Sequence, residues 1–170
     1  PDFAACLLKR AIEKGDQRAV VDCLLFAFEH YETEGVTDGD TFVRDALTFL
    51  NDRKEVRWVS EARFLKRATR LYEKLSPEIF SLLLQNLGYL RKVDYRAEWV
   101  LARLAEREPA AVWDYFGTRL IRDATESEQG DDEQRFEAVP YQFHGLEKEL
   151  LKNPQLALSK ALSWFVEKPE

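Results

Sequence analysis

The chain has 170 residues, of which 45% are hydrophobic and 33% charged, and its formal net charge is −6. This length and composition are typical of one globular domain, which buries enough surface to fold without a metal or a disulfide framework. A membrane-spanning segment is excluded because no apolar run approaches the about 18 residues that one requires. The net negative charge argues against a general nucleic-acid coat, and we expect a cytoplasmic protein with no membrane partner.

The abundance of Leu, Ala, Glu, Lys and Arg, with only seven glycines, favours helices over strands. We expect an all-α domain whose first helix covers 2–14 and ends at Gly15, because glycine commonly ends helices. Asp16 is then placed to cap a second helix over 17–31. This second helix is apolar over much of its circumference, which predicts a central position.

A loop is predicted over 32–40, because this stretch contains two glycines and several acidic residues. Asp40 is placed to cap a third helix that runs through Leu50. These three helices make up the N-terminal part of the predicted domain.

The clearest amphipathic pattern covers residues 58–75. On a helical wheel its apolar and basic residues fall on separate stripes, which predicts one amphipathic helix. The apolar stripe consists of Ala62, Leu65, Ala68, Leu71, Tyr72 and Leu75. The basic stripe consists of Arg63, Lys66, Arg67, Arg70 and Lys74.

Charge is unevenly distributed along the chain. Residues 52–74 contain eight basic and four acidic residues, a local charge of +4, whereas residues 123–137 contain seven acids and one base, a local charge of −6. A positive stripe on a helix can follow a phosphate backbone or attract an acidic protein surface, and it can also be a solvated face with no partner. The basic stripe is therefore a candidate binding surface.

Three later helices are predicted to open with a polar or acidic residue, a proline and helix formers. These openings are Ser76-Pro77-Glu78, Glu108-Pro109-Ala110 and Asn153-Pro154-Gln155, with their prolines 32 and 45 residues apart. Proline suits the first helical position because the N–H that it lacks has no intrahelical partner there. The helix after Pro77 is expected to end near Arg91, and further helices are predicted over 95–107 and 146–152.

The proline spacing and the helix lengths over 58–168 resemble a HEAT-like helical repeat, in which antiparallel helix pairs stack on their neighbours. The resemblance implies a short α-solenoid, and an irregular helical bundle is the alternative. Helical repeats of this kind often form the sensing or scaffolding part of large bacterial NTPase or defence proteins. The resemblance therefore implies one module of a larger polypeptide, as does a chain that starts at Pro1 and contains no Met.

Residues that could carry chemistry are few. The only histidines are His30 and His144, and neither lies in a catalytic motif. The chain contains no Gly-x-x-x-x-Gly-Lys-Ser/Thr phosphate loop, no Gly-x-Gly-x-x-Gly fingerprint and no Cys-x-x-Cys pair. We expect no catalytic residue, no cofactor and no metal site.

The helical pattern is interrupted by an acid cluster and by an aromatic turn after Pro140. Tyr141, Phe143 and His144 in this turn form a candidate recognition tip, or they anchor the loop to the core. The predicted single domain, 1–170, thus divides into N-terminal helices (1–52), central helical hairpins (53–124), an acidic and aromatic loop (125–145) and C-terminal helices (146–170).

These observations predict a macromolecular interaction module, a sensor or scaffold, rather than an enzyme. Its expected partner is a protein or another domain of the same polypeptide. The alternative is a nucleic-acid-binding helical-repeat domain that uses the basic face of residues 53–74 on phosphates. The affinity of such a domain would fall steeply with salt.

Overall fold

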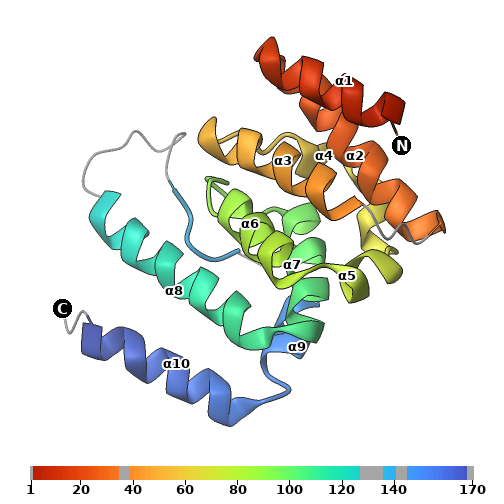
Figure 1. Cartoon of the computed structure of the whole chain (residues 1–170). Helices are drawn as coiled ribbons and strands as arrows, with labels where there is room; N and C mark the ends of the chain where they lie inside the picture. The colour runs from red at the N-terminus through yellow and green to blue at the C-terminus, as the bar shows by residue number, and fades with distance from the viewer. Residues whose placement is uncertain (1, 35–38, 127–135, 141–144, 168–170) are drawn as a thin grey trace. The chain divides into compact units, whose positions relative to one another are not determined.

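The computed structural model describes residues 2–34, 39–126, 136–140 and 145–167 (Figure 1). Within these ranges the chain forms helices and no strand, which confirms the predicted all-α fold class. None of the described helices is both long and apolar enough to cross a membrane. The chain divides into two compact units, residues 1–89 and 90–170. The boundary lies within the stretch predicted as central hairpins.

The described residues of the first unit form six α-helices and one short 3₁₀ helix. Helix α2 packs against α1, α3, α4 and α5, and α3 packs in turn against α6, so the core of this unit surrounds α2 and α3. Buried core residues on these two helices include Val20, Leu24, Phe28, Val43, Leu47 and Leu50. The elements are α1 (Asp2–Glu13), α2 (Gln17–Glu34), α3 (Gly39–Asp52), α4 (Trp58–Glu61), η1 (Arg63–Lys66), α5 (Arg70–Lys74) and α6 (Pro77–Leu87).

Local signals define the turn between α1 and α2 as predicted. Gly15 has a φ of 67°, a left-handed conformation that favours glycine. The Asp16 Oδ1 atom accepts a hydrogen bond from the Ala19 N–H at 3.0 Å, which is the interaction of a helix cap.

The predictions for the next loop and its cap are partly wrong. Helix α2 continues to Glu34, and α3 already begins at Gly39, so Asp40 lies within the first turn of α3 instead of capping it. The Asp40 Oδ1 atom instead accepts a hydrogen bond from the Tyr31 hydroxyl at 2.6 Å. The hydroxyl at the end of α2 thus competes for the carboxylate that the local pattern assigned to a cap.

The prediction of one continuous helix over 58–75 is wrong. The stretch is divided into α4, η1 and α5, with a break at Ala62 (φ −82°, ψ 57°). The predicted apolar stripe is nevertheless buried at all six positions. Four of these, from Ala62 to Leu71, recur every three residues. In an α-helix such a row turns by about 60° at each step, whereas a 3₁₀ helix keeps it on one face.

A buried hydrogen-bond network joins α3, α4 and α6. The Asn86 Oδ1 atom accepts a hydrogen bond from the Trp58 indole N–H at 2.7 Å. The Asn86 amide donates to Asn51 Oδ1 at 2.7 Å and to the Glu55 carbonyl at 3.1 Å. Asn86 is fully buried, so these bonds replace water at every polar atom of its side chain.

The second unit consists of α7 (Tyr95–Arg107), α8 (Pro109–Glu126), α9 (Leu146–Leu150) and α10 (Pro154–Glu167) within the described residues. Helix α7 packs against α8 and α9, and α10 packs against α8. Helices α8 and α10 run in the same direction, from right to left in Figure 1. Helix α7 has the predicted bounds and is capped by Asp94, whose Oδ1 atom accepts a hydrogen bond from the Ala97 N–H at 2.9 Å.

Helices begin at all three predicted proline openings. The Ser76 hydroxyl oxygen accepts a hydrogen bond from the Ile79 N–H at 3.4 Å, and Asn153 Oδ1 accepts one from the Leu156 N–H at 3.0 Å. The helix after Pro77 ends at Leu87, four residues earlier than predicted.

Arg119 is a buried cation in the core of the second unit, with 2% of its surface exposed. Its guanidinium donates to the Leu90 carbonyl at 2.6 Å and to the Ala138 carbonyl at 3.0 Å, and it also donates to the carbonyls of Arg91 and Glu137. Burial lowers the pKa of this guanidinium. Arg119 thus connects α8 to two chain segments that form no helix.

Gly117 on α8 provides the space that Trp164 on α10 occupies. A Cβ atom at Gly117 would overlap the indole ring of Trp164, which also packs against Trp113 with ring centroids 5.7 Å apart. We expect Gly117→Ala to displace Trp164. The free energy needed to separate α10 from α8 should then fall by about 1–2 kcal/mol. Hydrogen exchange of the α10 amides would measure this.

Thr118→Ala is the matched control, because Thr118 is exposed on the same helix. Unchanged exchange protection of α10 in Gly117→Ala would contradict the packing role of Gly117.

Candidate binding surface

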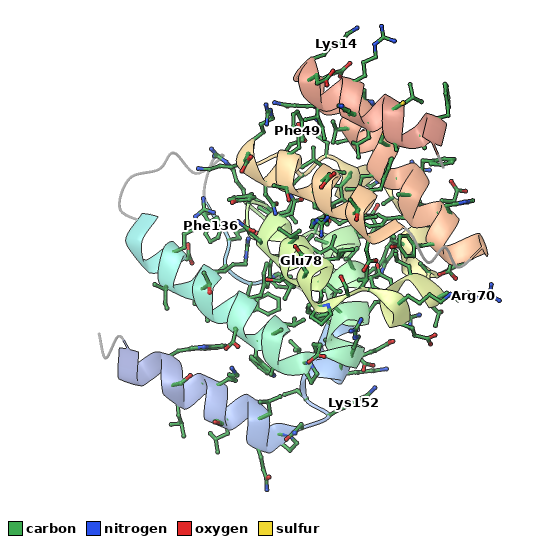
Figure 2. The ribbon with its side chains drawn as sticks, in the orientation of Figure 1. Lys14, Phe49, Arg70, Glu78, Phe136 and Lys152 are labelled. Carbon is green, nitrogen blue, oxygen red and sulfur yellow. The ribbon has the colours of Figure 1, made fainter. Side chains whose placement is uncertain are left out.

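The five predicted basic residues lie on one short surface of the first unit. Arg63 and Lys66 belong to η1, Arg67 follows it, and Arg70 and Lys74 belong to α5. All five are exposed, while Leu65, Ala68, Leu71 and Tyr72 between them are buried and Phe64 is half-buried. We call residues 63–74 the basic segment. Figure 2 shows the Arg70 side chain extending outward from the helices of this unit.

The basic segment is held against α2 at both of its ends. Beside its first residue, Glu61 accepts a hydrogen bond from Arg18 Nη1 at 2.8 Å. Near its other end, Glu32 Oε2 accepts one from the Leu71 N–H at 3.1 Å. Because Arg18 and Glu32 lie near opposite ends of α2, the segment follows the length of this helix.

The charge of the basic segment differs in sign from that of its surroundings. The first unit contains 15 acidic and 13 basic residues, and five of the basic residues lie in the segment together with one acid, Glu73. The segment therefore carries +4, while the rest of the unit carries −6. Such a contrast attracts anionic groups to one place on the surface.

Two of the three basic residues at 53–57, which precede the segment, make side-chain contacts within the fold. The Arg53 guanidinium lies 3.6 Å from the centroid of the Phe49 ring. Arg57 Nη2 lies 2.8 Å from Glu55 Oε2. Burial opposes ionisation of Glu55, but the hydrogen bonds and charge of Arg57 prevail and lower its pKa. The predicted basic face of residues 53–74 is therefore not one uniform surface.

An aromatic pair on α2, with one exposed and one half-buried ring, was not predicted from the sequence. Phe26 is 56% exposed and stacks on His30 with ring centroids 5.7 Å apart. The helix was predicted to be central because it is apolar over much of its circumference, and that pattern hides one apolar residue that faces solvent. The other aromatic candidates, Tyr141, Phe143 and His144, lie outside the described residues.

The described residues contain no group of three or more His, Cys, Asp or Glu side chains placed to hold a metal ion. Cys6 is exposed and Cys23 is half-buried, and both are free thiols. Burial and the charge of Asp22 raise the pKa of Cys23, which disfavours its reactive thiolate. What the described arrangement provides is an exposed, positively charged surface.

Comparison with known proteins adds no relative from which a role could be carried over. No family model, no curated protein and no solved structure matches this chain.

Proposed function

We propose that this chain is a macromolecular interaction module, a sensor or scaffold, that binds an acidic surface of a protein partner through the basic segment. The observation that carries the proposal is the exposure of Arg63, Lys66, Arg67, Arg70 and Lys74 on one anchored segment of a unit that is otherwise negative. Interaction surfaces of opposite charge accelerate encounter and select partners.

The proposed architecture is a short HEAT-like stack of helix pairs. Supporting it, α7 packs against α9 and α8 packs against α10 in the second unit, and α1 packs against α3 in the first. Packing between alternate helices is the arrangement that stacked helix pairs require. A stack of this kind presents a continuous helical surface, which suits recognition of another macromolecule.

A protein partner is favoured over nucleic acid for two reasons. A surface that follows a phosphate backbone needs a row of cations that neutralises many phosphates, whereas Arg53 and Arg57 are engaged by Phe49 and Glu55. The five cations of the basic segment lie within 12 residues, and the chain as a whole carries −6. Nucleic-acid binding through residues 53–74 is the competing outcome of the experiment.

The test is a charge reversal on the full chain. The variant Arg63→Glu/Arg67→Glu/Arg70→Glu is compared with Lys9→Glu/Arg10→Glu/Lys14→Glu, the α1 variant, which makes the same charge change at exposed residues of α1 and of the turn that follows it. The immobilised proteins are incubated with lysate that has or has not been treated with nuclease, and retained proteins are quantified by mass spectrometry. We expect acidic proteins to be retained by the wild type and the α1 variant and to decrease at least about tenfold on the segment variant.

A second measurement distinguishes the two partner classes. Binding of a 20-nucleotide single-stranded oligonucleotide is followed by fluorescence anisotropy at two salt concentrations. Equal retention by the two variants would contradict the proposal. Loss of all retained protein with nuclease, together with salt-sensitive oligonucleotide binding that requires the basic segment, would assign the surface to nucleic acid.

A further inference from the structure

The basic segment contains two hydroxyl side chains, and only that of Thr69 is exposed. The Tyr72 hydroxyl is buried and donates a hydrogen bond to the Leu65 carbonyl at 3.3 Å. Thr69 lies between η1 and α5, in a stretch of three residues, 67–69, that belongs to neither helix. Ala68 beside it is fully buried, so the chain is anchored there while Thr69 faces solvent.

The Thr69 hydroxyl contributes little to the fold. Thr69 occupies the cap position before α5, where a threonine oxygen commonly accepts a backbone N–H, but its side chain makes no cap hydrogen bond. The hydroxyl donates to the Arg67 carbonyl at 3.4 Å, at the exposed surface. By contrast, the Ser60 hydroxyl, in α4, donates to the Arg57 carbonyl at 3.0 Å. Thr69 therefore presents an accessible hydroxyl whose modification costs the fold little.

Cations flank Thr69 on both sides. Lys66 and Arg67 come three and two residues before it, and Arg70 follows it directly. All three are exposed, and Figure 2 shows the Arg70 side chain extending outward. A protein kinase that selects basic substrates has acidic groups in its peptide groove, so cations at these positions attract the enzyme and align the hydroxyl with it.

We propose that Thr69 is a phosphorylation site for a protein kinase that selects basic substrates, and that the phosphate switches off the binding of an acidic partner by the basic segment. This switch rests on the proposed function of the segment. The Thr69 oxygen attacks the γ-phosphorus of ATP, and the bond from that phosphorus to the β,γ-bridging oxygen breaks. ADP leaves with the electron pair of that bond, and the hydroxyl proton passes to a carboxylate of the kinase.

A phosphate on Thr69 would change the electrostatics of the whole segment. Phosphothreonine carries a charge of about −1.5 to −2 at pH 7, so the segment would fall from +4 to about +2. The phosphate also offers three strong acceptor oxygens to the guanidinium groups of Arg67 and Arg70, which are two residues and one residue away. It would therefore compete, from within the chain, with the carboxylates of a partner.

The first measurement determines whether Thr69 accepts phosphate. The full chain is incubated with ATP, Mg²⁺ and a purified serine/threonine kinase that selects basic substrates, and the modified residues are identified by mass spectrometry. We expect phosphate on Thr69 in the wild type and in Ser60→Ala, and its loss from this position in Thr69→Val, which keeps the side-chain shape. Ser60 is the matched control, because it is exposed and follows Arg57 by three residues. Phosphate on other residues but not on Thr69 would overturn the proposal.

The second measurement determines what the phosphate does. Binding of a fluorescein-labelled polyglutamate peptide, the probe for an acidic surface, is followed by fluorescence anisotropy before and after kinase treatment of the full chain. We expect phosphorylation of the wild type to raise the dissociation constant at least about threefold, with an unchanged circular dichroism spectrum. Kinase treatment of Thr69→Val is expected to leave the dissociation constant unchanged.

The charge-reversal variant Arg63→Glu/Arg67→Glu/Arg70→Glu separates failure of the switch from failure of the proposed function. Weaker peptide binding by this variant, together with unchanged binding after phosphorylation, would overturn the switch and leave the proposed function standing. Peptide binding that neither change weakens would overturn both. Whether Thr69 is modified is decided by mass spectrometry in either case.

Discussion

Replacing Asn86 with leucine is expected to reduce the free energy of unfolding of the first unit by about 3–5 kcal/mol. Leucine has the same branching and the same number of side-chain heavy atoms as asparagine but offers no hydrogen bond. The variant would therefore leave the Trp58 indole N–H, Asn51 Oδ1 and the Glu55 carbonyl without the partner seen in the structure. Each polar group buried without a partner costs about 1–3 kcal/mol.

Hydrogen exchange followed by mass spectrometry would localise the effect, because peptides from the two units are resolved separately. We expect faster exchange across α3, α4 and α6, with the second unit much less affected. Ser81→Leu is the control, since Ser81 is exposed on the same helix. Equal exchange in the two variants would show that the network contributes no stability.

Replacing Arg119 with methionine is expected to destabilise the second unit by about 3–5 kcal/mol. Methionine fills much of the same volume, but four backbone carbonyls lose the donors that the guanidinium supplies. Phe136 would also lose the guanidinium that lies 4.4 Å from its ring centroid. The expected result is a lower unfolding temperature, with early loss of exchange protection at residues 90–93 and 136–140.

Arg119→Lys should recover only part of this stability, because a single ammonium group cannot reach carbonyls on two separate segments at once. Arg103→Met is the control, since Arg103 is 34% exposed and pairs with Glu106 on its own helix. Exchange in residues 136–140 that is as slow in Arg119→Met as in the wild type would contradict the role assigned to Arg119.

The break in the helix predicted over 58–75 shows how local and tertiary information differ. The buried residues of this stretch were predicted correctly. Ala62, Leu65, Ala68 and Leu71 belong to the predicted apolar stripe, and all four are buried. Their spacing of three was a signal for a tighter backbone than the α-helix. The hydrogen bond from the Leu71 N–H to Glu32 is not predictable, because its acceptor lies 39 residues away on α2.

The residues of the candidate binding surface were predictable from the sequence, but the contacts that hold this surface against α2 were not. Exposure of the five basic residues follows from their alternation with apolar residues. The ion pair between Arg18 and Glu61 depends on which elements pack together, because the two residues lie 43 positions apart. The exposure of Leu158 and Leu162 on α10 was not predicted, because an apolar residue in an amphipathic helix is expected to face the core.

The sequence by itself determined the helical class and most helix ends of this protein. Caps, first-turn prolines and the left-handed Gly15 act over three or four residues, so their effects can be read locally. Only the tertiary structure decided that a charged Arg119 is buried, that 58–75 divides into α4, η1 and α5, and that Leu158 and Leu162 on α10 are exposed. These outcomes depend on partners distant in the chain, and burial free energy overrides local propensity when the two conflict.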